Sequence, residues 1–245
     1  MGEVTTMRYA ILADIHGNLE ALETAAEYLE KHGPERVVCL GDSVGYGANP
    51  NECLDWVLRH SAMHVLGNHE AAVLHEKIRW SFMGCARIAI DWTADRLRSE
   101  LINGIRELPY LQVSPPATIA HGTIYRPEDF EYLMDDDAGM KSFMALATPF
   151  GFVGHSHVPF GISETGKEKD GYLREGVLKL SKGKRYLLNP GSIGQPRDGD
   201  PRLSFGIFDA DELTFEIVRL PYDNKKAAAK IRAEGLPGVL AGRLL

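Results

Sequence analysis

Five short apolar runs, each followed directly by residue types that bind metal ions, constrain the fold of this chain more than any other feature. Each run has the length and continuous apolar character of a strand buried on both faces. The runs are residues 9–13, 36–40, 63–66, 118–120 and 150–153, and the residues that follow them are Asp14 and His16, Asp42, Asn68, His121, and His155 and His157. In open α/β sheets, sites form at the carboxyl ends of the strands. We therefore expect these side chains to converge on one edge of a sheet.

Length and composition indicate an ordinary globular chain. It has 245 residues, of which 44% are hydrophobic and 25% are charged. A chain of this size can bury a full core without disulfide bonds. We find no internal repeat, and no linker long enough to separate two domains. We therefore predict one domain over residues 1–245.

Cysteine use and hydropathy predict a reducing, cytoplasmic setting. The chain has three cysteines, Cys39, Cys53 and Cys85, and none forms a C-x-x-C pair. Cys39 lies within an apolar run, where we expect a small buried hydrophobic residue. Low cysteine use and the absence of a signal-peptide pattern favour the cytoplasm. No apolar run approaches the roughly 20 residues of a membrane-spanning helix, so we expect no membrane association.

The net charge of −7 at pH 7 limits the class of partner. A protein that grips a long polyanion is usually basic, so we expect no extended nucleic acid as a partner. The acidity does not exclude small anionic substrates, because bound divalent cations would dominate the local field.

The remaining segments complete the predicted element order. Leucine and alanine spacing predicts a helix that starts near Leu19 and stops at Gly33-Pro34. Further helices are expected over residues 86–107, 128–146 and 224–233, the second interrupted by the acidic run 135–137, which we expect at a solvated helix terminus or loop. In the first of these, Ile88, Trp92, Leu97 and Leu101 are candidate core contacts. The last third is strand-rich, with strands expected at 172–180, 185–188, 203–208 and 213–220.

The ligand types indicate mixed nitrogen and oxygen coordination. Asp14 and His16 are two residues apart, so in an extended loop both can face one cation. Asp42 follows Gly41, which allows a close backbone approach and a sharp turn, and its carboxylate can bridge two cations about 3.5–4 Å apart. Asn68 offers a neutral oxygen. Such a ligand set suits Mn, and also Fe, Zn or Ni.

These segments resemble a known family. Asp14-Ile15-His16, Gly41-Asp42, Gly67-Asn68-His69-Glu70, His121 and Gly154-His155-Ser156-His157 are similar to the calcineurin-like metallophosphoesterase superfamily, whose pattern is D-x-H, G-D, G-N-H-[DE], H and G-H-x-H. The resemblance implies an α/β fold, a four-layer αββα sandwich with two mixed β-sheets. The strand-rich last third suits the second sheet.

The resemblance also implies residue roles. It predicts two divalent cations, the first held by Asp14, His16, Asp42 and His157, and the second by Asp42, Asn68, His121 and His155. His69 corresponds to the family's catalytic histidine and would protonate the leaving oxygen, although a histidine that only orients a ligand is the alternative. Two such cations lower the pKa of a water held between them, which then attacks phosphorus.

Further details of the sequence motifs resemble the small bacterial and archaeal phosphodiesterase branch of this family. The G-D-x-x-D-R-G arginine of serine/threonine phosphatases is missing from residues 41–47. The loop Asn189–Arg197 resembles that branch, and Ser192 and Arg197, with Asn68, are candidate substrate contacts. A tight turn between two sheets is an equal alternative for the loop. Arg197 and Arg202 can instead pair with Asp198 or Asp200, and Tyr46 and Tyr125 can either stack on a nucleobase or pack.

The leading hypothesis is therefore a metal-dependent phosphoric ester hydrolase. It would act on small phosphodiesters or nucleotide-type phosphoanhydrides through an activated water. An idle metal-binding scaffold of the same fold and a phosphomonoesterase are the alternatives. A nuclease would need a basic groove, which the charge balance does not supply.

Overall fold

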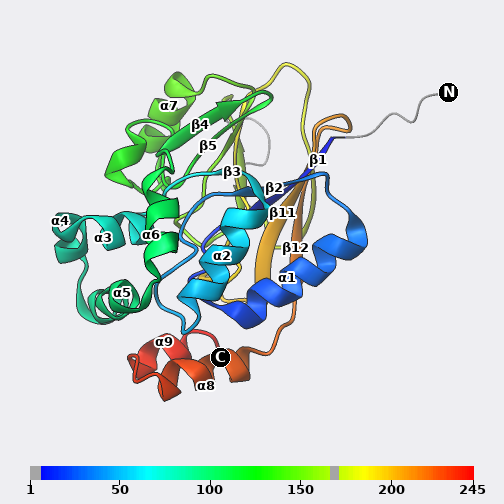
Figure 1. The fold of residues 1–245 in the computed structure, drawn as a ribbon. Coiled ribbons are helices and arrows are strands. Elements are labelled where there is room, and N and C mark those ends of the chain that lie inside the picture. Colours follow the sequence, from blue (N-terminus) through cyan, green and yellow to red (C-terminus); the bar gives the residue numbers. More distant parts are fainter. Residues whose placement is uncertain (1–6, 166–170) are drawn as a thin grey trace.

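The computed structural model describes residues 7–165 and 171–245, in which two six-stranded sheets are stacked face to face (Figure 1). The first sheet has the order β3 (Ser61–His64), β2 (Arg36–Cys39), β1 (Arg8–Leu12), β11 (Leu203–Asp209), β12 (Thr214–Leu220) and β9 (Gly176–Lys179). The second has the order β4 (Leu111–Ser114), β5 (Ala117–Ala120), β6 (Phe150–Phe152), β10 (Tyr186–Asn189), β7 (Phe160–Ser163) and β8 (Gly171–Tyr172). Both sheets are mixed. In the first sheet β1, β2 and β3 run parallel to one another, and in the second sheet β5, β6 and β10 do so, while the other strand pairs are antiparallel.

Helices cover the outer faces of the two sheets. Helices α1 (Leu19–His32) and α2 (Pro50–His60) pack on the first sheet through a buried cluster that includes Leu22, Val57 and Phe205. Helix α7 (Asp136–Ala145) packs on the second sheet, where Phe143 contacts the cluster around Leu187. The four layers confirm the predicted αββα sandwich.

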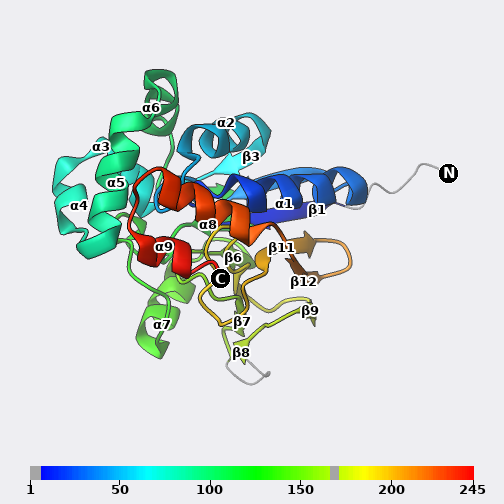
Figure 2. The same cartoon turned by 90° about the horizontal axis from the view of Figure 1, so that it is seen from below.

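The remaining helices lie beside the sandwich, as Figure 2 shows. They are α3 (Asn68–Leu74), α4 (Glu76–Ser81), α5 (Gly84–Arg96), α6 (Ser99–Arg106), α8 (Asn224–Ala233) and α9 (Gly238–Gly242). Helices α3, α5 and α6 share an apolar cluster that includes Ala71, Ile90 and Ile105. Helices α8 and α9 pack on α5 through Ile231, Leu240 and Ala89. None of the helices in the described residues is long and apolar enough to cross a membrane.

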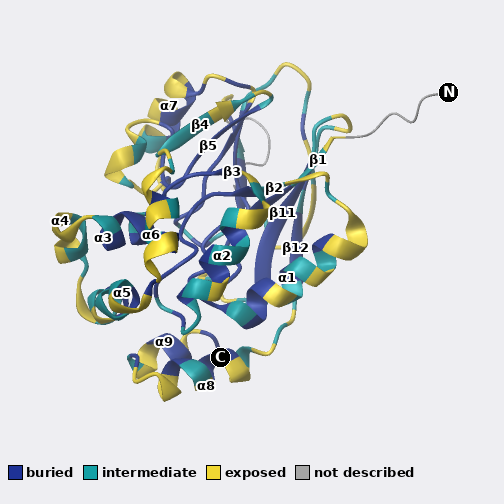
Figure 3. Ribbon diagram, viewed as in Figure 1, coloured by how far each residue is buried: buried dark blue, intermediate teal, exposed yellow. Residues whose placement is uncertain are grey.

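The apolar core lies between the sheets. Ile11 and Val38 of the first sheet meet Ile119 and Phe152 of the second in one buried cluster. Figure 3 shows central strands such as β11 as buried, whereas the edge strand β4 is partly exposed. Because the core continues up to the carboxyl ends of β1, β2, β5 and β6, the residues that follow those strands are held by a rigid base.

Several predicted elements are confirmed and several need correction. The helix from Leu19 ends at Gly33, which adopts a left-handed conformation, and the helix over 224–233 is confirmed. The acidic run supplies an N-cap, since the Asp135 side chain accepts from the backbone N–H of Ala138 at the start of α7. The prediction of Cys39 as a buried hydrophobic residue is also confirmed.

The predicted strand over 172–180 was wrong. Two strands occupy it, β8 paired with β7 in the second sheet and β9 paired with β12 in the first. Gly176, at φ 113°, adopts a backbone conformation that other residues rarely reach, and it marks the change of sheet.

Two further predictions need correction. The third strand occupies Ser61–His64, two residues earlier than expected. The segment 86–107 is helix-rich as predicted and holds two helices separated at Leu97–Arg98, with Leu97 and Leu101 buried. Ile88 is 55% exposed and is not a core residue. Helix α5 buries Ala89 and Ile90 instead, so the core-facing stripe begins one residue later than expected.

Candidate metal centre

Loops at the carboxyl ends of five strands bring the predicted ligands together. Among the described residues, three groups of side chains bring their ligand atoms together, and within each group these atoms lie no more than 4.8 Å apart. The groups are Asp14, His16 and His157; His16, Asp42 and His69; and Asp42, His121 and His155. The first and third groups correspond to the two predicted cation sites. The convergence follows from the topology, since β1, β2, β5 and β6 all end on this edge of the stacked sheets.

Asp42 lies between the two halves of the centre. Its Oδ2 is 3.7 Å from His16 Nε2 on one side and 3.3 Å from His121 Nε2 on the other. Asn68 Oδ1 belongs to the second half, 3.0 Å from His121 Nε2. This position is the one that a bridging carboxylate would occupy.

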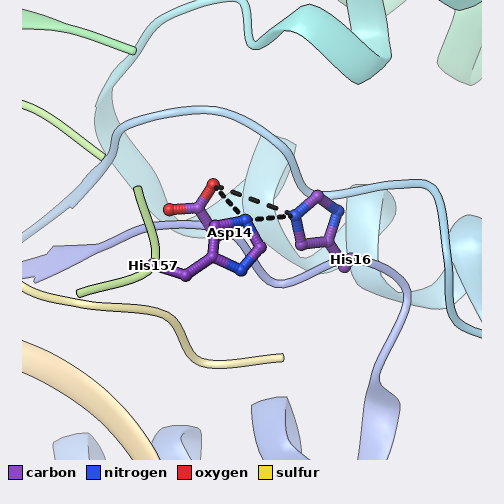
Figure 4. Close-up of side chains that lie close together, drawn as sticks. All are labelled: Asp14, His16 and His157. Carbon is purple, nitrogen blue, oxygen red and sulfur yellow. Dashed lines mark hydrogen bonds and ion pairs between the residues drawn. The ribbon is translucent and has the colours of Figure 1, made fainter. Parts of the chain in front are cut away.

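Three lone-pair donors face one point in the first half of the centre (Figure 4). His16 Nε2 and His157 Nε2 are 3.1 Å apart, and Asp14 Oδ1 is 3.8 and 3.4 Å from them. The Nδ1–H groups of both histidines donate to backbone carbonyls, those of Val44 and Gln195, so each Nε2 carries a lone pair.

The carboxylate of Asp14 is also incompletely satisfied by protein. Its Oδ2 accepts from the backbone N–H of His155, but Oδ1 is buried without a hydrogen-bond partner among the described residues. Lone pairs and a buried carboxylate oxygen that face each other without a proton between them are repulsive. A cation between them would remove that repulsion, so the residues present fit the ion that the family implies.

The second half gathers the same residue types in a different protonation state. His121 Nδ1 donates to the carbonyl of Leu40 at 2.8 Å, and its Nε2 faces His155 Nδ1 at 3.0 Å. Burial opposes protonation of His121, but the adjacent carboxylates, Asp42 above all, raise its pKa to about 9, so a cation here would displace a proton. The ring of His155 is covered on one side by Tyr132, whose centroid is 3.9 Å away. Backbone carbonyls thus orient three of the four predicted imidazole ligands.

Burial and neighbouring charges set the ionisation of the metal-free centre. Burial lowers the pKa values of His16 and His157 well below the usual value for histidine, and it lowers the pKa of His155 to about 3. These three imidazoles are therefore neutral, which is the state in which histidine binds a metal ion. Burial raises the pKa of Asp14 to about 7. Burial opposes ionisation of Asp42 too, but the adjacent histidines, His121 above all, bring its pKa well below the ordinary value. A cation at Asp14 would displace the proton that burial favours there.

Five of the predicted ligands have a left-handed backbone, which is uncommon outside glycine. Asp14, His16, Asp42, His155 and His157 have φ between 50° and 65°. Such conformations cost of order 1–3 kcal/mol each and cluster at functional sites. The prediction of an extended loop at Asp14–His16 was therefore wrong, although both side chains do face one point.

Gly41 is confirmed as a point of close approach. It has φ 93°, and a Cβ there would lie 2.6 Å from the backbone nitrogen of Gly67. Any side chain would push the Asp42 loop away from the loop that carries Asn68.

Glu70 holds these two loops together and had no predicted role. Its Oε2 accepts from the backbone N–H groups of Asp42 and Gly67, and its Oε1 from that of Ser43. The side chain is fully buried. The only sequence signal was its place in the segment Gly67–Glu70, where residue type alone does not distinguish a ligand from a residue that positions one.

His69 lies against Asp42 in a closely packed setting. Its backbone N–H donates to Asp42 Oδ1 at 2.9 Å, and its Nε2 is 3.9 Å from Asp42 Oδ2. The ring contacts Tyr46 and Phe82, with centroids 4.5 and 4.9 Å away. Burial lowers its pKa to about 4. The catalytic role of His69 stays a prediction.

The Asn189–Arg197 loop joins β10 of the second sheet to β11 of the first and braces the centre. Ser192 Oγ donates to the carbonyl of Asp14 and accepts from the N–H of Gln195. Asn189 Nδ2 donates to the carbonyl of Gly154. These contacts favour a positioning role for Ser192 over the predicted substrate contact, because its hydroxyl is fully buried and already engaged.

The arginines of this region differ in their partners. Arg202 pairs with Asp200 and Glu175, which is the surface alternative considered above. Asp198 pairs with Arg219 and not with Arg197. Arg197 is exposed near the centre and remains a candidate substrate contact. Tyr46 packs on His16, with ring centroids 4.6 Å apart.

Comparison with known proteins agrees with this site. Residues 7–213 match the model of the calcineurin-like phosphoesterase superfamily domain. The chain therefore belongs to the calcineurin-like phosphoesterase superfamily, a family of metallophosphoesterases that bind divalent metals.

Similar proteins occur in bacteria and archaea. The chain is 40% identical over 242 residues to an uncharacterized protein of Methanocaldococcus jannaschii, covering 96% of both chains. It resembles the crystal structure of a metallophosphoesterase from Sphaerobacter thermophilus at 37% identity, with a TM-score of 0.87 and 98% of both chains covered. A hypothetical protein from Pyrococcus horikoshii shares the fold at 21% identity, with a TM-score of 0.77 and 97% of both chains covered.

Proposed function

We propose that this protein is a binuclear phosphoesterase that hydrolyses small phosphodiesters or nucleotide-type phosphoanhydrides. The observation that carries the proposal is the shared carboxylate: Asp42 Oδ2 lies within 4 Å of both His16 and His121, each of which belongs to a separate group of candidate ligands. A single-cation site would not need two such groups around one carboxylate. Mn is the cation we propose, with Fe, Zn or Ni as alternatives that the same ligands accept.

When bound, two cations would supply a hydroxide nucleophile and neutralise the phosphoryl oxygens. The chain itself supplies His69 as the proton donor, packed between the rings of Tyr46 and Phe82. His69 Nδ1 is buried without a partner among the described residues, while its Nε2 points towards Asp42. Burial keeps His69 neutral in the free protein, and a phosphoryl anion beside it would raise its pKa and favour the proton that it passes to the leaving oxygen.

A cavity of about 670 Å³ opens onto the second half of the centre and supports a nucleotide-like substrate. Its lining includes the predicted ligands Asn68 and His155 and the aromatic rings of Phe82, Phe130 and Tyr132. Flat aromatic surfaces beside a phosphate site suit a base or another planar leaving group. The net charge of −7 supports a small substrate over extended nucleic acid.

The test compares cleavage of bis-p-nitrophenyl phosphate with that of the mono-ester, in protein whose Mn content is measured. We expect preferential cleavage of the diester. His69→Ala should lower kcat by about 10²–10⁴ while it retains metal, since only the proton donor is lost. His60→Ala, a change at an exposed histidine of α2, is the matched control.

Other outcomes would redirect the proposal. Full activity in His69→Ala would remove the assigned role, and loss of metal from that variant would make His69 a ligand. Preference for the mono-ester would indicate a phosphomonoesterase. Two bound cations without turnover of any phosphoester would indicate a scaffold that has kept its metals.

A further inference from the structure

A second cavity lies next to the metal centre and shares Tyr46 with the aromatic cavity. It has a volume of about 500 Å³, and its lining includes Tyr46, Gln195, Arg197 and Arg243. Tyr46 lines both cavities and packs on His16 and His69. Both cavities therefore reach Tyr46, whose ring lies against a predicted metal ligand and the predicted catalytic residue.

Two arginines from distant parts of the chain converge in this second cavity. Arg197 Nη2 and Arg243 Nη1 each lie 3.5 Å from Gln195 Oε1. Gln195 is only 2% exposed, and its backbone carbonyl accepts from His157 Nδ1 at 2.6 Å. One buried residue thus links the arginine pair to a predicted metal ligand.

The arginine pair lacks the carboxylates that neutralise its neighbours. Arg202 pairs with Asp200, and the buried Arg219 pairs with Asp198, immediately after Arg197 in the chain. Within residues 7–165 and 171–245, neither Arg197 nor Arg243 forms an ion pair, and their common partner is a neutral amide. The charge of Arg197 acts on Asp14 from a distance, but no carboxylate of the described residues pairs directly with either guanidinium, so in a chain of net charge −7 the two like charges form a place where an anion can bind.

The main chain at Arg243 is held firmly enough to serve a binding site. Arg243 directly follows helix α9, and the adjacent Leu244 is buried in the cluster that joins α8, α9 and α5. Asn224 Nδ2 donates to the carbonyl of Leu244 at 2.9 Å. The guanidinium is therefore presented from a fixed backbone while the side chain itself reaches the cavity.

We infer that the cavity between Arg197 and Arg243 binds a second phosphate of the substrate, next to the phosphorus at the metal centre. The inference rests on the proposed function and deepens it: the preferred substrates would carry at least two linked phosphates, as nucleoside polyphosphates and their diesters do. Guanidinium groups hold phosphate oxygens through paired, charge-assisted hydrogen bonds. A simple diester with one phosphate would leave this cavity unused.

The first experiment measures selectivity. In Mn-loaded protein, kcat/KM is determined for diadenosine tetraphosphate and for bis-p-nitrophenyl phosphate. We expect Arg243→Gln to lower the ratio of kcat/KM for diadenosine tetraphosphate to kcat/KM for bis-p-nitrophenyl phosphate by about tenfold, which is the contribution of one charged hydrogen bond. Arg243→Lys should restore only part of it, because an ammonium lacks the planar fork. Arg232→Gln, which removes the same charge from an exposed position on α8, is the matched control and should leave the ratio unchanged.

The second experiment measures binding without turnover. Calorimetry on Mn-loaded protein compares imidodiphosphate with orthophosphate, and we expect the wild-type preference for imidodiphosphate to fall about tenfold in Arg243→Gln and to persist in Arg232→Gln. This arm decides the inference even if the protein hydrolyses no ester, in which case only the proposed function fails. If Arg243→Gln lowered kcat/KM equally for both substrates and affinity equally for both ligands, the arginine would act only as a general charge, and the inference would be overturned. If the variant lowered neither quantity, the arginine would have no role in binding, and the inference would also be overturned.

Discussion

The core between the sheets and the metal centre are equally buried, but the core consists of apolar side chains and the centre of polar and ionisable ones. Ala13 is in the apolar core and Asp14, the next residue, is in the centre, and both are 0% exposed. The core residue directly follows the regular strand β1, which ends at Leu12. The centre residue has a left-handed backbone and a carboxylate oxygen without a hydrogen-bond partner in the described part of the chain.

This difference separates the part of the fold that provides stability from the part that is arranged to bind metal ions. The core stabilises the structure through apolar contacts such as Phe152 on Phe208, 5.2 Å between ring centroids. The centre gathers the buried carboxyl of Asp14, the facing lone pairs of its first half and a strained backbone, all of which destabilise the metal-free protein. Bound cations would reverse much of that cost. Four changes test this contrast.

The largest effect is expected from Asp42→Asn, which removes the carboxylate shared by both halves. Turnover should fall to background, and affinity for the second cation should fall by more than the roughly 10–100-fold typical for loss of a residue that only orients a ligand. Metal content and hydrolysis of bis-p-nitrophenyl phosphate are the measurements. The metal-free variant should unfold at a lower denaturant concentration than the wild type near neutral pH, because the lowered pKa of Asp42 means that the folded protein stabilises its carboxylate. A variant that keeps two cations and full turnover would refute the bridging role.

Phe152→Ala tests the other side of the comparison. Phe152 is 1% exposed between the sheets, so its truncation should lower the free energy of unfolding by about 3–5 kcal/mol. Denaturant unfolding gives the loss, with Phe152→Leu as a milder control. Activity per folded molecule at saturating metal should stay within about twofold, because the change leaves the ligands in place. A large loss of activity in the folded fraction would show that core and centre are not separable.

Glu70→Gln is expected to weaken the centre without removing a ligand. Three backbone N–H groups donate to the Glu70 carboxylate, and an amide would turn a donor towards at least one of them. Metal affinity should fall about 10–100-fold, with kcat largely recovered at saturating metal. Metal titration followed by activity measures this. Glu76→Gln, at an exposed position of α4, serves as control. Unchanged affinity would reduce Glu70 to a stabilising residue.

His64 gives the smallest effect and compares a histidine outside the centre with those in it. Both ring nitrogens of His64 are buried without partners in the described residues, and burial lowers its pKa to about 3. Because the unfolded state, with a pKa near 6.5, binds the proton first, stability is lost as pH falls below 6.5.

His64→Leu should remove that loss. Measured without metal, its stability relative to the wild type should rise by about 2 kcal/mol between pH 7.5 and pH 5. Denaturant unfolding at the two pH values gives the difference. A pH-independent difference would mean that His64 is protonated at low cost in the folded state.

Much of this molecule follows from its sequence. The apolar runs predict β1, β2, β5 and β6, and the residues after them predict the convergence of ligands at one edge, because parallel strands end on the same side. Helices with clear stops or caps, such as α1 at Gly33, were also predicted accurately. Short elements were missed, among them α2, α3, α4, α9, β4 and β7, since a few residues of mixed character carry little periodic signal.

Residue chemistry and strand polarity are local properties, so the ligand types, their order and the sheet edge on which they meet follow from the sequence. The task of each side chain at that edge depends on the tertiary structure. Ser192 proved to brace Asp14, Glu70 to tie two loops, and Arg243 to approach Arg197 from 46 residues further along the chain. Such contacts depend on which loops the packed sheets bring together, and no pattern within a single segment records them.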